Sequence, residues 1–502
     1  MVPLVLMSGR RFMINKHFLA LALLGLVGSV AAQPLNPAID PLAARYSALQ
    51  GTSWAAAAGY VQNKAPLFSV RPDLRLAPAS TLKLLTSAAV LDAFGPQHRF
   101  QTQLYIDALP DEHGVLNGNL YIRAGGDPTL GSSRVQGSLN AEQLLQRWTQ
   151  QIRQAGIRKI NGDVYADISL FEGPSIPAKV NWQNIGNYFA APATALAFHD
   201  NSFQIHFAPQ ARPGAWVEVR STQPQTDGLR LRSFVTVDAG STKDNAYVYG
   251  APGQYEMEIY GTLPATRFTG YTISAALPDA PQLLTDLFVQ TLESHGVDVS
   301  GRGMLLEEAP DYEAMRLLYT HFSPPLQDIL YIVNKRSFNF YAEMLLRQLA
   351  VHAGHKGSVE AGLNELYRFL RRQGISTENV LLYDGSGLSR DNQLTVQTLL
   401  ELLQVMAQRP DFPSYYHSLA TLQDRGDLLL LRRFLAPFKR TQDVHVKGGT
   451  LDGVKAQAGY VRDQNGELIA FAFIANNLIA KDEGINRFYE DLLKLLLQQP
   501  QK

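Results

Sequence analysis

Hydrophobic and polar positions alternate with two different periods along the chain, and the change of period divides it into three stretches. Between Ser53 and Val70, two apolar runs flank the polar turn QNK, which predicts a pair of strands. From about Arg99 to Leu306, segments such as RFQTQLYI and YEMEIYG alternate apolar and polar residues between Gly, Pro, Asn and Asp. This period of two predicts an antiparallel, β-rich region interrupted by a few helices.

Helical periodicity returns after about Tyr312. The segments LQDILYIVNK, FYAEMLLRQLA and VEAGLNELYRFLRRQG repeat apolar residues every three or four positions, as one face of a helix requires. Near the end of the chain, VKAQAGYVRD and ELIAFAFIAN are joined by QNG, which predicts a hairpin, and INRFYEDLLKLLLQQ predicts an amphipathic helix. We therefore predict an α/β (α+β) protein with a β-rich middle.

The extreme N-terminus, residues 1–32, has the layout of a secretory signal peptide. A basic region runs from Arg10 to Lys16, and an apolar region from Phe18 to Ala32 ends in small residues. We expect cleavage after Ala32, rather than an apolar core helix, and hence an exported protein that is periplasmic if its source is a Gram-negative bacterium. No later segment reaches about 18 uncharged apolar residues, so we expect no transmembrane anchor after cleavage.

Composition narrows the chemistry further. Hydrophobic residues make up 46% of the 502-residue chain and charged residues 18%, and the formal net charge of +0 gives no support to a nucleic-acid or anionic-membrane partner. Because the chain has no cysteine, it has no cysteine nucleophile, thiolate zinc site or iron–sulfur cluster. His352 and His355 form an H-x-x-H pair without a nearby acidic ligand, so we expect no metal and no other cofactor.

One charged residue is out of place in the apolar segment LAPASTLKLLTSAAVL. Lys83 is the only charge between Arg75 and Asp92, and a lysine is rarely buried without a partner or a task. Pro78 suits the first turn of a helix, and residues three apart on a helix share a face, so Ser80 and Lys83 are expected to meet. The alternative is a lysine whose tip reaches water.

A serine–lysine pair of this kind can act as nucleophile and base. A serine hydroxyl is a poor nucleophile until a base takes its proton, and a lysine can be that base only when neutral. Burial lowers a lysine pKa, and a shift from about 10.4 to about 7 takes roughly 4.6 kcal/mol. Ser-x-x-Lys alone is a weak motif, although Ser80–Lys83 is the only such pair in the chain.

Two further motifs strengthen this interpretation. Ser337 and Asn339 form S-x-N between two predicted helices, and Lys447 and Gly449 form K-x-G on a predicted strand. The order S-x-x-K, S-x-N, K-x-G is that of penicillin-binding proteins and serine β-lactamases. A second S-x-N ends at Asn140, but the residues AEQ that follow indicate a helix capping box there instead.

With these motifs the sequence resembles the D-alanyl-D-alanine carboxypeptidases/endopeptidases of the penicillin-binding protein 4 type. PASTLK resembles the nucleophile helix of that family and NKRSFNFYAE its second element, while YDGSGLSR (383–390) and GGDPTL (125–130) resemble further segments typical of it. The 257 positions from Ser80 to Ser337 accommodate the large insertion that distinguishes the family. The resemblance, which covers most of the chain after Ala32, implies a penicillin-recognising serine transpeptidase/β-lactamase-like domain with a large β-rich insertion.

The implied domain organisation brings the two ends of the chain together. After the signal peptide (1–32), residues 33–95 and 312–502 are expected to form one D,D-peptidase (penicillin-binding) domain, in which both ends share an antiparallel sheet flanked by helices. Residues 96–311 are expected to form inserted β-rich subdomains.

The resemblance also implies catalytic roles. Ser80 is the acylated nucleophile, Lys83 is its base, and Ser337 passes a proton to the leaving amine. The implied activity is that of a serine-type D-Ala-D-Ala carboxypeptidase/D,D-endopeptidase, which cleaves peptidoglycan stem peptides through an acyl-enzyme. Its partners are then peptidoglycan peptides, with β-lactam antibiotics as covalent inhibitors.

Four more residues are implied in substrate binding. Asn339 binds the peptide chain of the substrate, and Lys447 attracts its terminal carboxylate and tunes the serine of S-x-N. Gly449 and Thr450 belong to the same binding strand, and the backbone N–H groups of Ser80 and Thr450 form the oxyanion hole. These residues come from three distant segments and are expected to converge in one cleft.

The third motif departs from the family in one place. The family has Thr or Ser between Lys447 and Gly449, where this chain has Gly448. A hydroxyl that hydrogen-bonds a charged carboxylate contributes roughly 1.5–3 kcal/mol, or about 10- to 150-fold in affinity. Either Thr450 compensates from two positions on, or the chain is a non-catalytic or weakly active penicillin-binding cell-wall protein.

A β-lactamase is the remaining alternative. Residues 360–364 spell E-x-x-L-N, the motif that holds the deacylating glutamate of class A β-lactamases. Glu360, however, lies beside an apolar helical stripe that runs from Val359 to Leu370, which predicts a surface glutamate and a coincidental match. A Ser-His-Asp hydrolase is disfavoured because the chain has no G-x-S-x-G elbow.

Overall fold

A computed structural model gives the structure of the chain and describes residues 39–421, 444–479 and 483–498. The predicted signal peptide, residues 1–32, lies outside the described residues, so its cleavage stays a prediction. Within the described part of the chain, no helix is both long and apolar enough to cross a membrane.

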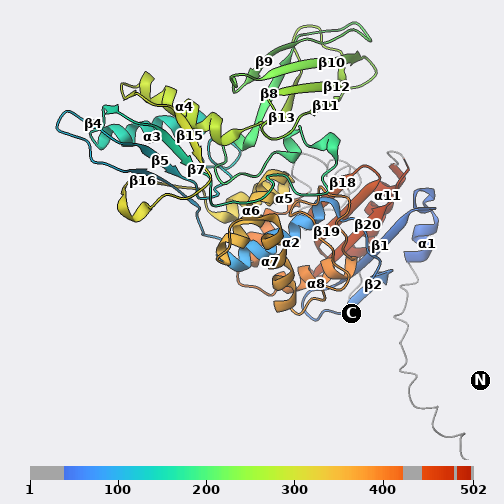
Figure 1. Ribbon diagram of the computed structural model, residues 1–502. Helices are drawn as coiled ribbons and strands as arrows, with labels where there is room; N and C mark the ends of the chain where they lie inside the picture. The colour runs from blue at the N-terminus through green and yellow to red at the C-terminus, as the bar shows by residue number, and fades with distance from the viewer. Residues whose placement is uncertain (1–38, 422–443, 480–482, 499–502) are drawn as a thin grey trace, which may run out of the picture. The chain divides into compact units, whose positions relative to one another are not determined.

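The two ends of the described chain meet in a six-stranded antiparallel sheet ordered β17-β18-β19-β20-β1-β2 (Figure 1). β1 lies beside β20, with Ala57 opposite Ala472. The strand pairs predicted around QNK and QNG are confirmed as β1–β2 and β19–β20. The strands are β1 (Ser53–Tyr60), β2 (Pro66–Val70), β17 (Ala420–Thr421), β18 (Val444–Leu451), β19 (Val454–Arg462) and β20 (Leu468–Asn476).

This sheet is buried on both faces because its strands alternate with period two between two hydrophobic cores. In β20, alternate residues from Ala470 to Ile474 face one core, while Phe471 and Phe473 between them face the other. Burial on both sides explains why ELIAFAFIAN is apolar throughout instead of alternating with polar residues. The core that contains the phenylalanines is closed by α1 (Ile39–Ala44) and α11 (Glu483–Leu497).

Helices from both ends of the chain cover the opposite face. α8 packs on β1 and β20, and α2 packs on α5, α6 and α7. Every residue of α2 from Lys83 to Leu91 is buried, which is why its sequence shows no polar face. These helices are α2 (Lys83–Phe94), α5 (Leu326–Lys335), α6 (Asn339–His352), α7 (Val359–Arg372), α8 (Val396–Met406) and α9 (Phe412–Ser418).

The segment between the two ends forms further sheets around a separate core. The largest has the order β15-β7-β5-β3-β16, in which β3 is antiparallel to β5 and β16 while β5, β7 and β15 run parallel. Trp148 of α3 packs edge-on against Phe288 of α4 in the same core. The elements are β3 (Gln101–Ile106), β5 (Leu120–Arg123), β7 (Val164–Asp167), β15 (Gly303–Leu306), β16 (Arg316–Phe322), α3 (Ala141–Gln154) and α4 (Ala280–Ser294).

Three-stranded sheets complete this segment, in the orders β13-β8-β9, β10-β12-β11 and β14-β6-β4. The first is antiparallel, the second pairs β10 with β12 in parallel, and the third is parallel. The strands are β4 (Val115–Leu116), β6 (Lys159–Ile160), β8 (Ser202–Phe207), β9 (Val219–Gln223), β10 (Arg230–Asp238), β11 (Asn245–Tyr249), β12 (Glu256–Pro264), β13 (Thr272–Ala276) and β14 (Asp298–Val299).

The prediction of an antiparallel, β-rich middle region is therefore wrong for those strand pairs that run parallel. Side chains alternate with period two in both kinds of sheet, so the pattern does not distinguish them. Parallel neighbours need a crossover connection, and α3 supplies one between β5 and β7. The helices inside the region were the available indication of parallel pairing.

One strand crosses a predicted boundary. β16 comes from Arg316–Phe322 and pairs with β3, so a sheet of the middle segment includes residues beyond 311. The division into 33–95 plus 312–502 and an inserted 96–311 stays a prediction. Short 3-10 helices lie at η1 (Ser47–Leu49), η2 (Ala79–Leu82), η3 (Trp182–Asn184), η4 (Tyr188–Ala190), η5 (His199–Asn201) and η6 (Tyr312–Ala314).

Candidate active site

Ser80 and Lys83 lie at the N-terminal end of α2. Residues 79–82 form the 3-10 turn η2 rather than the α-helical turn predicted from Pro78, and α2 begins at Lys83. The turn starts with Ala79 at a φ of 47°, in the left-handed region. The two side chains nevertheless meet, with Lys83 Nζ 2.9 Å from Ser80 Oγ.

Lys83 is fully buried, and three oxygen atoms from separate segments surround its amine. Nζ lies 2.9 Å from Ser80 Oγ, 2.7 Å from Asn339 Oδ1 and 2.6 Å from the carbonyl oxygen of Ser386. These acceptors match the three N–H donors of an ammonium. A neutral amine has two N–H donors, so when Asn339 and Ser386 accept those, its lone pair faces the hydroxyl of Ser80.

The surroundings of Lys83 favour this neutral form. Burial lowers the pKa of Lys83 from its usual 10.5 to about 7, while the nearby carboxylates Asp384 and Glu343 act in the opposite direction. A pKa near the working pH gives a general base both a neutral fraction and enough basicity.

Ser337 lies in the turn between α5 and α6, in a strained conformation with a φ of 55°. Two side chains pack on the ring of the next residue, Phe338. The guanidinium carbon of Arg134 lies 4.4 Å from the ring centre, and the ring of Tyr341 packs edge-on at 4.9 Å. Arg134 also pairs with Asp200, with Nε 2.6 Å from Oδ2. Side chains of the middle segment therefore help to hold the turn that carries Ser337.

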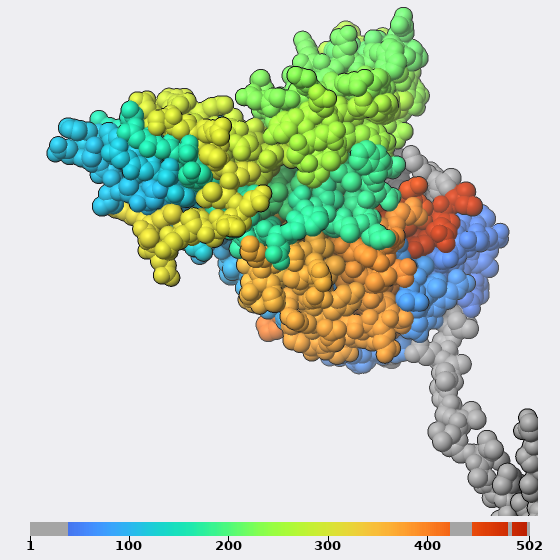
Figure 2. Space-filling view, in the orientation of Figure 1, coloured from blue at the N-terminus to red at the C-terminus, as the bar shows by residue number. Residues whose placement is uncertain are grey.

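Asn339 begins α6, and both ends of its amide are engaged. Its Oδ1 accepts from Lys83, and its Nδ2 donates to the carbonyl oxygen of Phe189 at 2.7 Å. Phe189 belongs to η4, which packs on α6. Figure 2 shows the green surface of this part of the middle segment directly against the orange surface of the helical region. The orientation of Asn339 is thus fixed from two sides.

Lys447 lies on β18 and is 2% exposed. Its Nζ lies 2.8 Å from Ser337 Oγ and 2.6 Å from the carbonyl oxygen of Gly448. Because residues two apart on a strand share a face, Lys447 and Gly449 both face the helices, and Gly448 and Thr450 face the other way. The partners of Lys447 and Gly449 on β19, Ala458 and Ala456, belong to the helix-side core.

Gly449 brings β18 close to the turn of Ser80. A Cβ at Gly449 would lie 2.9 Å from the backbone nitrogen of Ser80 and 2.9 Å from the carbonyl oxygen of Pro78. Only glycine allows an approach this close, so the K-x-G strand is seated directly against the nucleophile turn. A Cβ at Gly448, in contrast, would meet no atom within 4 Å, so there is space for the hydroxyl that this chain lacks.

The residues predicted from the three motifs are therefore brought together. Contacts link Lys83 to Ser80 and Asn339, link Ser337 to Lys447, and seat Gly449 on the Ser80 turn. Thr450 lies at the exposed end of β18, where its Oγ1 accepts from Lys455 Nζ at 2.9 Å. The chemical roles of these residues stay predictions.

The sequence interpretation missed two carboxylates next to Lys83. Glu343 is 6% exposed and Asp384 is fully buried, and both hold the loop that contains Ser386. Glu343 follows Asn339 by four positions, which places it on the same face of α6. Asp384 lies within the segment YDGSGLSR, which was singled out without assigning it a role. Helical spacing was the available indication for Glu343.

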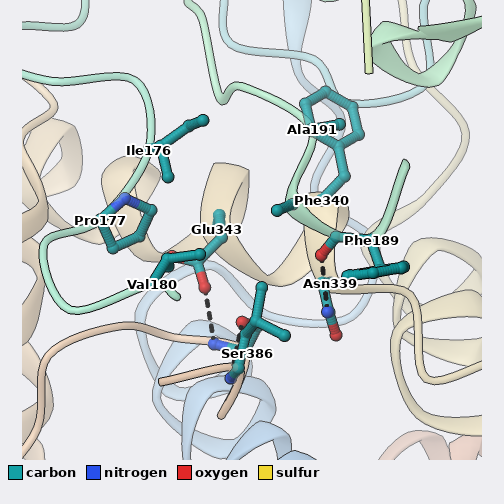
Figure 3. A pocket seen from close by; sticks show the side chains of 11 residues that line it. Ile176, Pro177, Val180, Phe189, Ala191, Asn339, Phe340, Glu343 and Ser386 are labelled. Carbon is teal, nitrogen blue, oxygen red and sulfur yellow. Dashed lines mark hydrogen bonds between the residues drawn. The ribbon is translucent and has the colours of Figure 1, made fainter. Parts of the chain in front are cut away.

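A small, mostly apolar hollow lies beside this site (Figure 3). Asn339, Glu343 and Ser386 form part of its wall, and Figure 3 shows Glu343 reaching toward the backbone of Ser386. The remaining lining comes largely from the middle segment: Ile176, Pro177, Val180, Phe189, Ala190 and Ala191, together with Phe340 and Leu388.

The motifs set aside in the sequence lie elsewhere. Asn140 caps α3, with Oδ1 accepting from the backbone nitrogen of Gln143. Among the described residues no cluster of three or more His, Cys, Asp or Glu could hold a metal ion, and His352 packs on the ring of Phe94. Glu360 is exposed in the first turn of α7.

Comparisons with known proteins agree with the resemblance. The family model for the D-Ala-D-Ala carboxypeptidase 3 (S13) family matches residues 35–493. A D-alanyl-D-alanine carboxypeptidase of Actinomadura sp. (strain R39) is 30% identical over 421 residues, which cover 82% of this chain and 75% of that protein. D-alanyl-D-alanine carboxypeptidase DacB of Haemophilus influenzae is 28% identical over 416 residues, covering 80% and 81%.

Solved structures agree on the fold. The crystal structure of penicillin binding protein 4 (dacB) from Haemophilus influenzae has a TM-score of 0.78 at 24% identity, covering 92% of this chain and 99% of that one. A crystal structure of the same protein complexed with a β-lactam has a TM-score of 0.74. The predicted fold class is confirmed by this likeness, and the predicted resemblance by the family match. This chain belongs to the D-Ala-D-Ala carboxypeptidase 3 (S13) family.

Proposed function

We propose that this chain cleaves the terminal D-Ala-D-Ala bond of peptidoglycan stem peptides, and related D,D-cross-links, through an acyl-enzyme on Ser80. The observation that carries the proposal is the buried amine of Lys83, whose two other acceptors leave its lone pair for the Ser80 hydroxyl. The function follows from the family, and the residue roles below are our assignment.

In the acylation step, Ser80 Oγ attacks the carbonyl carbon of the penultimate D-alanine while its proton moves to Lys83 Nζ. The carbonyl oxygen takes up negative charge as the new C–O bond forms. In this proposal the backbone N–H groups of Ser80 and Thr450 stabilise this oxyanion, and the close approach of β18 to the Ser80 turn at Gly449 supports that assignment. Such donors act without reorganisation because they belong to fixed backbone.

The C–N bond then breaks, and the leaving amine needs a proton. In this proposal Ser337 supplies it and is reprotonated by the proton that Lys83 took from Ser80, so Lys83 is neutral again. The amine of Lys447, 2.8 Å from Ser337 Oγ, stabilises the negative charge that develops on that oxygen. Lys447 also attracts the terminal carboxylate of the leaving D-alanine, and Asn339 binds the peptide chain. In deacylation, water attacks the ester while Lys83 takes one of its protons, and Lys83 passes that proton to Ser80 Oγ as the acyl group leaves as a carboxylic acid, which restores the enzyme.

β-Lactams are the corresponding covalent inhibitors in this proposal. A β-lactam presents its strained amide and its carboxylate to the same groups as D-Ala-D-Ala, so Ser80 would be acylated. A related solved structure, penicillin binding protein 4 of Haemophilus influenzae, was obtained in complex with a β-lactam. Export through the signal peptide of residues 1–32 would bring the enzyme to its peptidoglycan substrate.

Fluorescent penicillin followed by mass mapping of the adduct tests the proposal. We expect one labelled peptide carrying Ser80 and release of D-alanine from a peptide ending in D-Ala-D-Ala. Ser80→Ala should abolish both. Labelling at another serine, or no turnover and no labelling of a folded wild-type protein, would reject it.

Gly448 supports a weakly active or binding-only protein as the second candidate. Such a protein would be labelled by penicillin at Ser80 but would release no measurable D-alanine. The two measurements together therefore separate the candidates. Rapid release of hydrolysed penicillin would instead indicate a β-lactamase.

A further inference from the structure

Glu343 lies between the site and the hollow of Figure 3, with its carboxylate on the backbone of one loop. Its Oε1 accepts from the backbone nitrogen of Ser386 at 2.8 Å, and both oxygens lie 3.2 Å from the backbone nitrogen of Gly385. The carbonyl of Ser386, on the other side of the same residue, accepts from Lys83 Nζ at 2.6 Å. One residue of backbone therefore separates Glu343 from the lysine.

Asp384 holds the same loop from within. Its Oδ1 accepts from the backbone nitrogen of Gly387 and from Asn392 Nδ2, both at 2.8 Å, and its Oδ2 accepts from the backbone nitrogen of Ser389 at 2.6 Å. The hydroxyl of Thr86, on α2, donates to the carbonyl of Gly385 at 2.7 Å. These bonds fix the position and orientation of the loop relative to α2.

We propose that Glu343 is a positioning residue for acylation: it fixes the Ser386 carbonyl that orients Lys83 toward Ser80, and the charge of its carboxylate acts on the Lys83 amine. This inference rests on the proposed role of Lys83 as the base. Glu343 touches neither the nucleophile nor the substrate in this scheme and acts through the loop and through its field.

The charged neighbours of Glu343 are consistent with this role. Burial and the charge of Asp384 raise the pKa of Glu343 to about 7, while the loop hydrogen bonds and Arg347 on its own helix act in the opposite direction. The carboxylate is therefore charged toward the upper part of the pH range in which Lys83 loses its proton. The charged group of α2 that faces Glu343 is Lys83. Both Asp384 and Glu343 raise the pKa of Lys83 and so favour its protonated form. Arg347 does not bond to Glu343; its guanidinium donates to backbone carbonyls of Glu172, Pro174 and Gly357.

The middle segment presents apolar side chains to this side of the site. Its residues around the hollow are Ile176, Pro177, Val180, Phe189, Ala190 and Ala191. Lys179, in the same stretch, pairs with Asp391 at 3.7 Å, and its side chain is 55% exposed. Glu343 therefore sits in a nonpolar wall, where its field on Lys83 is weakly screened.

Holding a loop with a buried carboxylate is unfavourable in free energy. Burying a charge costs several kcal/mol unless hydrogen bonds and a cation offset it, and a neutral side chain can bind the same N–H groups at lower cost. A purely structural role would thus be served by glutamine. A role that depends on the charge would be lost in the glutamine variant. The glutamine variant therefore distinguishes a structural role from a charge-dependent role.

The test compares Glu343→Gln with Glu343→Ala in penicillin acylation between pH 5 and pH 9. Glutamine keeps the Oε1 acceptor and removes the charge. We expect a near wild-type rate at high pH, with the midpoint of the acid limb moved to lower pH, because Lys83 loses a neighbour that favours its charged form. In the alanine variant the Ser386 loop loses its hydrogen bonds to Glu343, so Lys83 is less well placed. Because misplacing a reacting group by about 1 Å costs about 100-fold in rate, we expect the acylation rate to fall by about that factor at every pH.

Glu360→Gln is the matched control, since Glu360 is exposed on α7 and outside the site. It should match wild type in rate and pH profile. A Glu343→Gln profile that superimposes on wild type overturns the inference, and Glu343→Gln alone decides it if the alanine variant does not fold. If wild type itself is not labelled at Ser80, the proposed function fails instead, which the same experiment reports separately.

Discussion

Two buried lysines flank the site, and their surroundings differ. Lys83 comes from a helix, is 0% exposed and meets oxygen atoms from its own turn, from α6 and from the Ser386 loop. Lys447 comes from a strand, is 2% exposed and contacts Ser337 Oγ and the carbonyl of the next residue on its own strand. The amine of Lys83 thus meets oxygen atoms of three segments, whereas Lys447 joins its own strand to the turn that carries Ser337.

This difference indicates two different tasks. Burial lowers the pKa of Lys83 to about 7, which suits the general base that we propose it to be. The amine of Lys447 lies against the hydroxyl of Ser337, where our proposal has it stabilise negative charge and attract a carboxylate. A lysine near an active serine is therefore interpreted from what surrounds its amine rather than from its distance to the serine.

Removing the Lys83 amine should have the largest effect. In Lys83→Met the side chain keeps its length and apolar packing, but Ser80 loses its base. General-base catalysis contributes about 10²- to 10⁴-fold, so the second-order rate of penicillin acylation should fall by that factor. Lys159→Met, at an exposed position of β6, is the matched control and should leave the rate unchanged. An acylation rate within about tenfold of wild type would contradict the assignment of the base.

Removing the Lys447 amine should cost less. Lys447→Met deletes a charge-assisted hydrogen bond and the attraction for the substrate carboxylate, worth roughly 1.5–3 kcal/mol, or about 10- to 150-fold in kcat/KM. The loss should be smaller for a peptide whose terminal carboxylate is amidated, because one of the two contacts is then already absent. Equal losses on both peptides would argue against a carboxylate contact.

The sequence predicted much of this arrangement because the relevant patterns are local. Ser80 and Lys83 are three residues apart, Ser337 and Asn339 two, and alternation along β18 sets which residues face the helices. Even where the local geometry differed, as in the 3-10 turn of η2, a turn of three residues still placed Lys83 beside Ser80.

The parts that escaped prediction depend on contacts between distant segments. The carbonyl oxygens of Ser386 and Phe189 hold Lys83 and Asn339, but a backbone oxygen has no sequence signature. Arg134 reaches Phe338 from more than 200 positions away, which no local pattern shows. Parallel pairing of β5 with β7 escaped for a similar reason, since it depends on a crossover rather than on the strands themselves.

The pH dependence of acylation should report Lys83 and not Lys447. Below about pH 7 Lys83 is protonated and cannot accept the Ser80 proton, so kcat/KM should fall about tenfold for each pH unit, whereas above it the rate should level off. Lys447→Met should keep the same midpoint at a lower plateau. A flat profile from pH 5 to 8, measured with penicillin, would contradict a titrating base.

Gly448 offers the smallest and most selective change on the Lys447 side. In this family the position carries a hydroxyl, and in this chain a side chain there would meet no atom within 4 Å. Gly448 also lacks the positive φ that would make a larger residue strained. Thr450, two positions on, faces the same way and accepts from Lys455 at its hydroxyl, and we expect it to make part of the missing contact.

We therefore expect Gly448→Thr to raise kcat/KM on a D-Ala-D-Ala peptide by about tenfold, the low end of what a hydrogen bond to a carboxylate contributes. Penicillin acylation should rise by a similar factor, because its carboxylate is held at the same place. Gly448→Val has the same shape without the hydroxyl and should give no gain, and an amidated peptide should remove the gain of the threonine variant. If threonine and valine behave alike, the hydroxyl is not what this site lacks, and the carboxylate is held by Lys447 and its neighbours without position 448.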